Sequence, residues 1–385
     1  SGTKTQIVDT RKTTPCLRIL EKYASVLKEA EELKGVSLGR DAWRRLCKSR
    51  TAMLSLWILV ALFVLTVLTP LIPFQPPRTV HMSRQFQSPS FEPAPPLVAP
   101  ASTADAGLNE KQRLQKSLEE GFGNLDFFSR SLLHARVLLF GNWSIPSICG
   151  TDTHGRDILS RIFWGGRISI AVGIVATLVS LVIGVTYGAI SGYLGGWVDN
   201  LMMRLVDVGY SIPFIFIVIF IITILSSENI KVRLDSFGID RLMIFFLLVG
   251  AIYWLTMARV VRGQVMSLKN EQFVEAARTL GASRARIIFA HLVPNTLSVV
   301  IVYLTLTIPR VILFEAFLSF LGLGVETPDV SWGLLVNQGL QVINPVKTYA
   351  WLVIFPSLAL GITLFALNFL GDGLRDALDP RMKNR

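Results

Sequence analysis

The side chains that could perform chemistry are few, and their spacing argues against an enzyme. The block GTDTHGRD at 150–157 is rich in polar groups, but it lacks the nucleophile beside a base that covalent catalysis requires. The histidines fall in separate segments, and none pairs with another at the spacing of a zinc site: His81, His134, His154 and His291. We therefore expect no catalytic residue and no metal ligand, and we expect Asp152, Arg156 and Asp157 to form a structural hydrogen-bond cluster.

Two charged side chains, Arg310 and Glu315, interrupt an apolar stretch that begins at Leu292. Charged groups at membrane depth are candidates for a transport pathway. Arg310 lies about 27 Å along a helix from Leu292, at 1.5 Å per residue, near the outer edge of the hydrocarbon. There it can snorkel to the headgroups or pair with Glu315. Alternatively, it faces a pathway across the membrane, where a guanidinium can bind the carboxylate of a solute through two hydrogen bonds.

The source of energy for transport is expected to be another chain. The sequence contains no GxxxxGK[ST] motif, the loop that holds nucleotide phosphates in many ATPases. A proton-coupled secondary transporter should place Asp, Glu or His inside its spans. The six apolar runs given below contain none of them, and only the fifth continues into charged residues, Arg310 and Glu315. A secondary transporter is therefore the weaker alternative.

These residues must be positioned by membrane helices. Hydrophobic residues make up 51% of the chain and charged residues only 17%, against roughly 25% in soluble domains. A helix crosses the hydrocarbon in about 20 residues. Six runs lack Asp, Glu, Lys and Arg: 51–77, 168–198, 208–227, 242–258, 292–309 and 348–371. We predict an all-α integral membrane protein with six transmembrane helices, and no binding to nucleic acid despite a net charge of +11.

The basic residues predict the orientation of the chain in its membrane. Four segments expected on the cytoplasmic side carry 23 Lys and Arg in 115 residues: 1–50, 191–207, 259–291 and 371–385. Three segments expected on the outer side carry 15 in 150 residues: 72–167, 226–241 and 310–347. The density is about twofold higher inside, as the positive-inside rule requires. Both termini are therefore expected in the cytoplasm, with the first transmembrane helix at 51–71 and a five-helix core at 168–370.

Two regions outside the spans have a pattern of their own. The stretch 37–50 is basic and amphipathic, so it is a topology signal, a helix in the headgroup plane with Trp43 and Leu46 inward, or both. The periplasmic loop 72–167 starts with a proline-rich part that should be extended and mobile, and we expect 86–103 to contribute little to transport. Helical spacing then appears from 108 to 139, which predicts a lid, a docking element or an idle insertion.

Three glycines in the second run recur at every fourth position, namely Gly184, Gly188 and Gly192. They share one face of a helix and let a second helix approach closely. The pattern suits a close-packed transport core and ordinary tight packing equally. Pro213 should kink or cap the third run.

The cytoplasmic loop 259–291 has the most informative pattern. Asn270 is a plausible N-cap, and an apolar face then recurs at helical spacing through Phe273, Ala276, Ala277 and Leu280. Gly281 suits a left-handed helix end, and Ser283 can cap a second helix. Two short helices joined at a glycine, with a knob of small residues, fit a helix-in-groove contact with a partner. A loop packed on its own protein is the alternative.

This loop resembles the EAA loop of bacterial ABC-importer permeases. The matching residues are Glu275, Ala276, Ala277, Gly281 and Pro294, with departures at His291 and Val293. Further blocks resemble C-type subunits of the oligopeptide and dipeptide permease family: GTDTHGRDILSRIFWGGRISI, SGYLGGWVDNLMMRLVD, LFEAFLSFLGLG and NFLGDGLRDALDP, together with RDAWRR and SLWILVALFVL. The resemblance covers about 37–70 and 150–385, so most of 78–149 looks like an insertion.

The resemblance implies a type I importer permease that forms half of a translocation pathway for peptides. It implies a second homologous permease subunit, two cytoplasmic ATPase subunits and a periplasmic or lipid-anchored substrate-binding protein. The cofactors ATP and Mg²⁺ are then expected in the ATPase subunits, with none bound by this chain. The implied coupling residues are Phe273, Glu275, Ala276, Ala277, Leu280 and Gly281. A dipeptide, a nickel chelate or another solute remains open as cargo.

Overall fold

The computed structural model describes residues 38–97, 109–123, 125–225, 227, 230 and 241–378. Within these ranges every regular element is a helix, in agreement with the all-α prediction. Four helices are long and apolar enough to cross a membrane: α3 (Arg50–Val67), α6 (Ile158–Leu194), the continuous helix Arg284–Phe320 and α15 (Trp351–Leu378).

Two bent helix pairs meet the same criteria of length and composition. One pair is α7 (Gly196–Ser211) with α8 (Phe214–Leu225), bent by 77°. Pro213 lies at this bend, as predicted, because proline cannot donate the backbone hydrogen bond that would continue α7. The other pair is formed by the two halves of α10 (Arg241–Leu268), bent by 41°. When each pair counts as one span, the total is six, as the charge-free runs predict.

The helix α6 starts ten residues before the second apolar run. Its first turns contain Arg161 and Arg167, and a rule based on charge therefore excluded them. Both guanidiniums have partners. Arg161 donates to the Asp152 carboxylate, and Arg167 Nη2 lies 2.9 Å from Ser129 Oγ. Paired arginines at the end of a span are tolerated where unpaired ones would not be.

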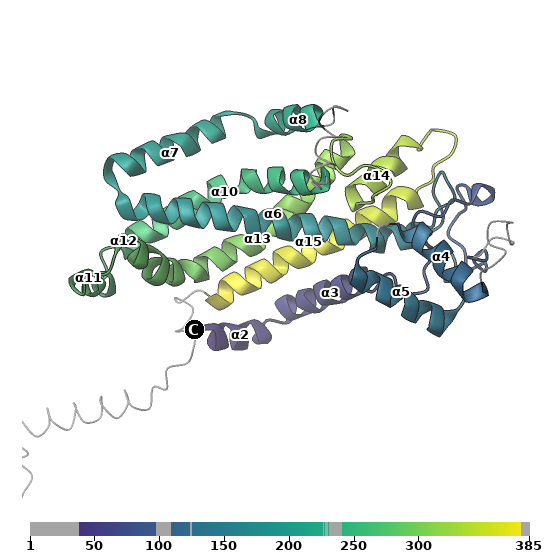
Figure 1. The fold of residues 1–385 in the computed structure, drawn as a ribbon, viewed down its shortest axis with the longest axis horizontal. Helices are drawn as coiled ribbons and strands as arrows, with labels where there is room; N and C mark the ends of the chain where they lie inside the picture. The colour runs from purple at the N-terminus through teal and green to yellow at the C-terminus, as the bar shows by residue number, and fades with distance from the viewer. Residues whose placement is uncertain are drawn as a thin grey trace, which may run out of the picture.

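The long helices lie side by side, and the shorter elements gather at the two ends (Figure 1). One end, called the loop end here, holds α2 (Leu38–Lys48), α11 (Gln272–Thr279) and α12 (Arg284–Arg286). The opposite end, called the cap end, holds α4 (Glu110–Phe122), α5 (Phe127–Phe140) and α14 (Trp332–Gln341). The single-turn helix η1 (Met82–Arg84) belongs to the connection between α3 and α4. From α12 the chain passes through the π-helical turn η3 (Ile287–Leu292) into α13 (Val293–Phe320) without a break.

The three glycines of α6 meet the backbone of α10. A Cβ atom on Gly184 would lie 2.9 Å from the Trp254 carbonyl oxygen, and one on Gly188 would lie 2.3 Å from the Ala258 carbonyl oxygen. A Cβ atom on Gly192 would lie 2.8 Å from the Arg262 carbonyl oxygen. The α10 residues also recur at every fourth position, so two matched helix faces touch at backbone distance.

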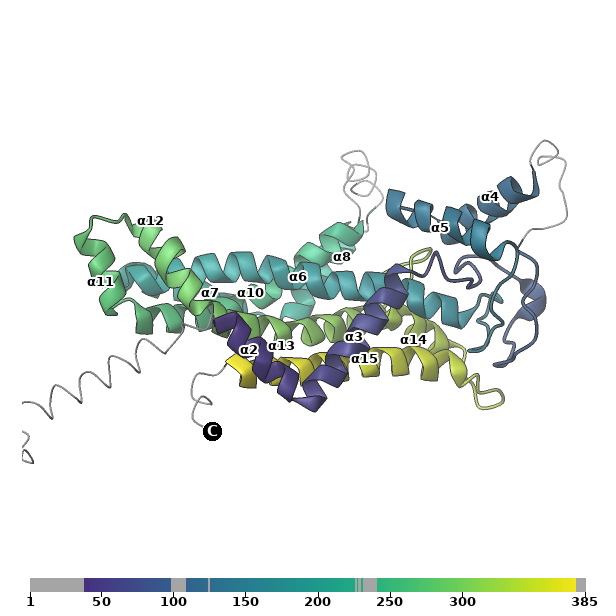
Figure 2. The ribbon, with the colours of Figure 1, turned by 90° about the horizontal axis from the view of Figure 1, so that it is seen from below.

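The N-terminal helix α2 makes a V with α3, and the turn between them is at Ser49 (Figure 2). Ser49 Oγ accepts a hydrogen bond from the Ala52 N–H and caps α3. Leu46 is buried against the C-terminal part of α15, as is Ala42. Trp43 is 54% exposed, so its insertion into the headgroup plane stays a prediction.

The proline-rich part of the outer loop is extended, but its described residues are held in place. Phe86 stacks on Tyr349 with ring centroids 4.1 Å apart. Leu97 is buried against α4, and its N–H donates to Asn142 Oδ1. These contacts contradict the expectation of a mobile segment for 86–97; residues 98–103 lie outside the described ranges.

The helices α4 and α5 form a hairpin that packs on this chain, with Leu118, Phe122 and Leu133 fully buried. The Phe122 ring meets the Trp164 ring of α6 edge to face, with centroids 5.1 Å apart. The helical part of the insertion is therefore a docked element of the cap end.

Candidate functional site

The loop between α10 and α13 has the two-helix form that its sequence predicts. The first helix, α11, ends at Thr279, and Gly281 follows its C-cap with a φ of 79°, a conformation that glycine adopts without steric cost. Ser283 Oγ accepts a hydrogen bond from the Arg286 N–H at 3.3 Å and caps the second helix. The N-cap of α11 is Glu271, so the predicted cap at Asn270 was one residue early.

The two alanines of α11 have opposite surroundings. Ala277 is buried together with Val274 in a cluster that includes Val261, Val265 and Leu292. Ala276 is exposed, as is Glu275. The prediction of one exposed Ala276/Ala277 knob was therefore wrong for Ala277. Its small side chain lies in the same buried cluster as residues of α10 and η3, and α11 packs mainly against η3.

The exposed surface of α11 contains an apolar strip beside polar residues such as Glu275. Phe273 is 38% exposed and Leu280 is 87% exposed, and Ala276 lies between them in the sequence. Within the described ranges no other part of the chain covers Leu280. The helix therefore packs one side on its own protein, as the alternative for the loop expects, and leaves an adjacent strip exposed, whose contact with a partner stays a prediction.

A polar cluster next to α11 joins three membrane helices at the loop end. Arg262 of α10 binds Asp199 of α7 through two hydrogen bonds, each 2.6 Å long. Ser191 of α6 donates to the same carboxylate, and Lys269 Nζ lies 3.3 Å from the Gly192 carbonyl oxygen. The cluster was missed from the sequence, because its members come from three separate segments. The acidic residue in the block SGYLGGWVDN, Asp199, was the sequence feature that could have indicated this cluster.

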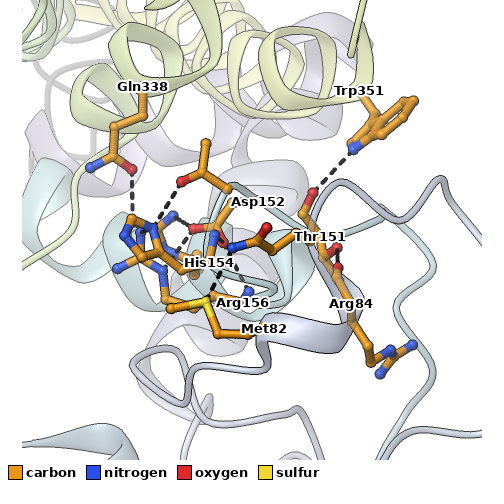
Figure 3. A network of polar contacts seen from close by, with 11 residues as sticks. Met82, Arg84, Thr151, Asp152, His154, Arg156, Gln338 and Trp351 are labelled. Carbon is orange, nitrogen blue, oxygen red and sulfur yellow. Dashed lines mark hydrogen bonds and ion pairs between the residues drawn. The ribbon is translucent and has the colours of Figure 1, made fainter. Parts of the chain in front are cut away.

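A second polar network lies at the cap end, where the chain enters α6 (Figure 3). Asp152 Oδ2 accepts from Arg156 Nε at 2.7 Å and from the Arg161 guanidinium. The backbone N–H groups of His154 and Arg156 donate to Asp152 Oδ1. Gln338 of α14 joins through Arg161 Nη2 at 2.9 Å. The structural cluster predicted for this block is present for Asp152 and Arg156, whereas Asp157 is not bonded to them and caps α6.

The two aspartates of this block have opposite pKa shifts. Burial acts to raise the pKa of Asp152, but the Arg161 and Arg156 guanidiniums and two backbone donors hold it below its ordinary value. Asp157 caps α6 by accepting from the Ser160 N–H at 2.7 Å. Burial without a strong ionic partner raises the pKa of Asp157 to about 7.

The structure does not bring Arg310 and Glu315 together. Glu315 is fully buried, and its carboxylate accepts hydrogen bonds from Ser319 Oγ at 2.7 Å and Ser169 Oγ at 3.3 Å. Arg310 is exposed and lines a groove of about 550 Å³ between α10, α13 and α15, which also contains Asn295 and Arg375. The predicted Arg310–Glu315 ion pair was wrong, because residues five apart lie on different faces of a helix.

Glu315 holds α13 to α6 inside the subunit.

In the part of the chain that the structure describes, no group of three or more His, Cys, Asp or Glu side chains could hold a metal ion.

The sequence of the long helices matches a known transport family. A family model described as "Binding-protein-dependent transport system inner membrane component" matches residues 184–384, which contain the loop and the groove. The chain belongs to this family. A second model, "N-terminal TM domain of oligopeptide transport permease C", matches residues 37–96, where α2 and α3 lie. The chain is thus a membrane-spanning permease of bacterial ABC importers, as its motifs predict.

Two curated relatives show how far the similarity extends. The permease is 36% identical over 358 residues to a dipeptide transport system permease protein of Bacillus subtilis, covering 92% of this chain and 90% of the relative. It is 50% identical over 232 residues to an oligopeptide transport system permease protein of Haemophilus influenzae, covering 60% and 70%.

A solved structure is also similar to the permease, namely an inward-facing MetNI methionine ABC transporter. The sequence identity is 18% and the TM-score is 0.42, with 57% of this chain and 96% of that chain covered.

Proposed function

We propose that the permease forms half of the pathway of an ATP-driven peptide importer and is coupled to an ATPase subunit by the outward face of α11. The observation that carries the proposal is the exposed apolar face of Phe273, Ala276 and Leu280 on a helix whose inner face is fixed to α10. A partner that moves α11 would move α10 and η3 with it. Transport of dipeptides and oligopeptides by the named relatives supports peptides as cargo.

The proposal places the loop end in the cytoplasm and the cap end outside. The higher density of Lys and Arg in the segments predicted to be cytoplasmic supports this orientation. The importer would contain a second homologous permease subunit, two ATPase subunits that bind ATP and Mg²⁺, and an external substrate-binding protein. The groove with Arg310 would face the pathway. Dipeptides and nickel chelates are the alternative cargoes within this family.

Two matched substitutions test the coupling face. In the assembled importer, Leu280→Arg should abolish co-purification of the ATPase or uncouple ATP hydrolysis from uptake, because it puts a charge on the free apolar face. Leu139→Arg changes a similarly exposed leucine at the cap end and should leave the ATPase bound. Normal co-purification and uptake with Leu280→Arg would overturn the assignment of this face.

The buried alanine gives an internal comparison. Ala277→Arg inserts a charge into a packed cluster, so it should lower the folded yield of the permease itself. Ala276→Arg should leave folding intact and reduce coupling. Uptake of labelled peptides and of a nickel chelate, each with its own binding protein, would decide the cargo.

A further inference from the structure

A deep apolar groove runs between α3 and α15, starting at the loop end. Its volume is about 610 Å³, and its walls include Leu54 and Ile58 of α3 and Leu358, Ile362 and Phe365 of α15. From 357 to 369 the α15 wall is about 18 Å long at 1.5 Å per residue. The groove is therefore an open, elongated apolar slot, and its length is that of a lipid chain rather than of a compact solute.

The helix that forms one wall is little covered by the rest of the permease. Only 17% of the span of α3 is buried. Trp57 is 65% exposed and Phe63 is 50% exposed on this helix. In a membrane these side chains face acyl chains, so lipid has direct access to the groove.

A stripe of cations lies at the loop end of the same groove. Arg40, Arg44 and Lys48 are exposed and recur at every fourth position on α2, and Arg50 starts α3. Thr51, the next residue, lines the groove. Within the described ranges these four cations have no carboxylate partner, whereas Arg45 binds Asp41 at 2.7 Å. The stripe thus presents unpaired positive charge beside an apolar slot.

The opposite face of α2 explains why the stripe stays at this position. Ala42 and Leu46 are buried against Ala377 and the leucines of the last turns of α15. A Cβ atom on Gly373 would lie 2.4 Å from Ala52 Cβ, so α15 and the start of α3 are also in close contact. The cations are consequently held beside the groove by packing and not by a flexible tail.

We propose that an anionic phospholipid binds here, with an acyl chain in the groove and its phosphate at the Arg44–Lys48–Arg50 turn. An apolar slot alone would accept any lipid chain, and a basic helix alone would attract any anionic surface. Their adjacency selects a molecule that has both an acyl chain and a net negative headgroup. The inference uses the inner-leaflet position of the loop end proposed above, but it does not depend on cargo or on ATPase coupling.

The purified, delipidated permease can be titrated with phosphatidylglycerol or phosphatidylcholine of the same acyl chains, and bound lipid counted by native mass spectrometry. Phosphatidylglycerol should bind more tightly, and added salt should weaken this preference. Arg44→Gln and Lys48→Gln should each weaken the binding of phosphatidylglycerol about fivefold, because each surface cation contributes about 1 kcal/mol. The binding of phosphatidylcholine should not change. Arg130→Gln, which removes an exposed cation at the cap end, is the matched control.

A second pair of variants tests the groove. Gly361 lines the groove, and a Cβ atom there would meet no atom within 4 Å, so Gly361→Leu fills the slot without a clash. Gly361→Leu should weaken the binding of both lipids. Gly263→Leu, at an equally open glycine of α10, should weaken the binding of neither. Leucine has a higher helix propensity than glycine, so neither change should unfold its helix.

Three results would overturn the inference. These are equal binding of the two lipids, equal behaviour of Gly361→Leu and Gly263→Leu, or cross-linking of a cysteine at Ile362 to the second permease subunit. The last result would make the groove a protein interface. None of them would alter uptake or ATPase coupling, so the proposed function would stand or fall separately.

Discussion

At the scale of single residues, Asp157 combines a helix cap with a buried carboxyl group. Its native pKa of about 7 lies above the ordinary value of 3.8, so the folded protein binds this proton more readily than the unfolded chain. Its contribution to stability is then full below about pH 4 and is lost as the pH rises through about 7. Asp152, with its lowered pKa, acts in the opposite direction and favours the folded state above its ordinary pKa.

We predict that Asp157→Asn flattens this pH dependence. Asparagine caps helices as well as aspartate does, but it does not titrate. The melting temperature of the purified permease should fall between pH 5 and pH 7.5, and that of the variant should fall less. Asp152→Asn is the control, because it should lower stability at neutral pH by breaking a paired charge. An identical pH profile for Asp157→Asn and the parent would refute the prediction.

Arg310 gives a second prediction at this scale, which rests on its exposed position in the groove. If its guanidinium binds the C-terminal carboxylate of a peptide, Arg310→Gln should reduce uptake of free-acid peptides about tenfold more than uptake of C-terminally amidated ones. A hydrogen bond to a charged group contributes about 1.5–3 kcal/mol, which sets this ratio. Equal loss for both peptides, in a normally assembled importer, would instead assign Arg310 to the headgroups.

At the scale of elements, α7 is held to α10 by two ion pairs of unequal burial. The side chain of Asp199 is 7% exposed in its pair with Arg262, whereas that of Asp207 is 63% exposed in its pair with Arg259. Water screens the second pair, so exposed pairs of this kind contribute little to stability. The first pair is shielded and shares its carboxylate with Ser191.

We therefore predict that Asp199→Asn lowers the free energy of unfolding by about 1.5–3 kcal/mol, the range for hydrogen bonds to charged groups. Asp207→Asn, the matched control on the same helix, should change it by less than about 1 kcal/mol. Thermal unfolding in detergent measures both. A similar effect of the two variants would mean that α7 is not fixed through Asp199.

The coupling loop shows which features of an element its sequence can predict. Gly281 and Ser283 were assigned correctly, because a helix end and a cap depend on local backbone chemistry. The buried face was assigned incorrectly, because α11 has only eight residues and its apolar side chains lie on two sides. Val274 belongs to the buried side and was passed over. Which side faces inward depends on α6 and α10, and no pattern within the loop contains that information.

At the scale of the whole molecule, the spans were predictable and their partners were not. Charge-free runs specify which segments cross the membrane, and glycine spacing specifies a close helix contact. The partner of that contact, α10, and the burial of Glu315 depend on the arrangement of distant segments. The outer segment 86–97 was taken as mobile from its prolines alone, although Phe86 and Leu97 anchor it.

This anchoring gives a prediction about the cap end as a unit. Leu97→Ala and Phe86→Ala should each destabilise the cap by about 2–3 kcal/mol, because Leu97 is buried and Phe86 is partly buried and stacked on Tyr349. Limited proteolysis should then cut near α4 and α5 sooner than in the parent. Phe91→Ala is the matched control, since Phe91 is 83% exposed. If Phe86→Ala resembles Phe91→Ala, the segment is dispensable as first predicted from its composition.

The unbroken helix from Arg284 to Phe320 has a mechanical consequence. It is 37 residues long, or about 55 Å, and it reaches from the loop end to the level of α14. Such a rod is a lever whose short arm is α12 beside α11. A tilt of about 5° at the loop would displace the far tip by about 5 Å over that length. A small tilt at the loop end would thus become a larger displacement at the cap end because of the length of the helix. The rigidity of this helix would determine how much of the movement reaches the cap end.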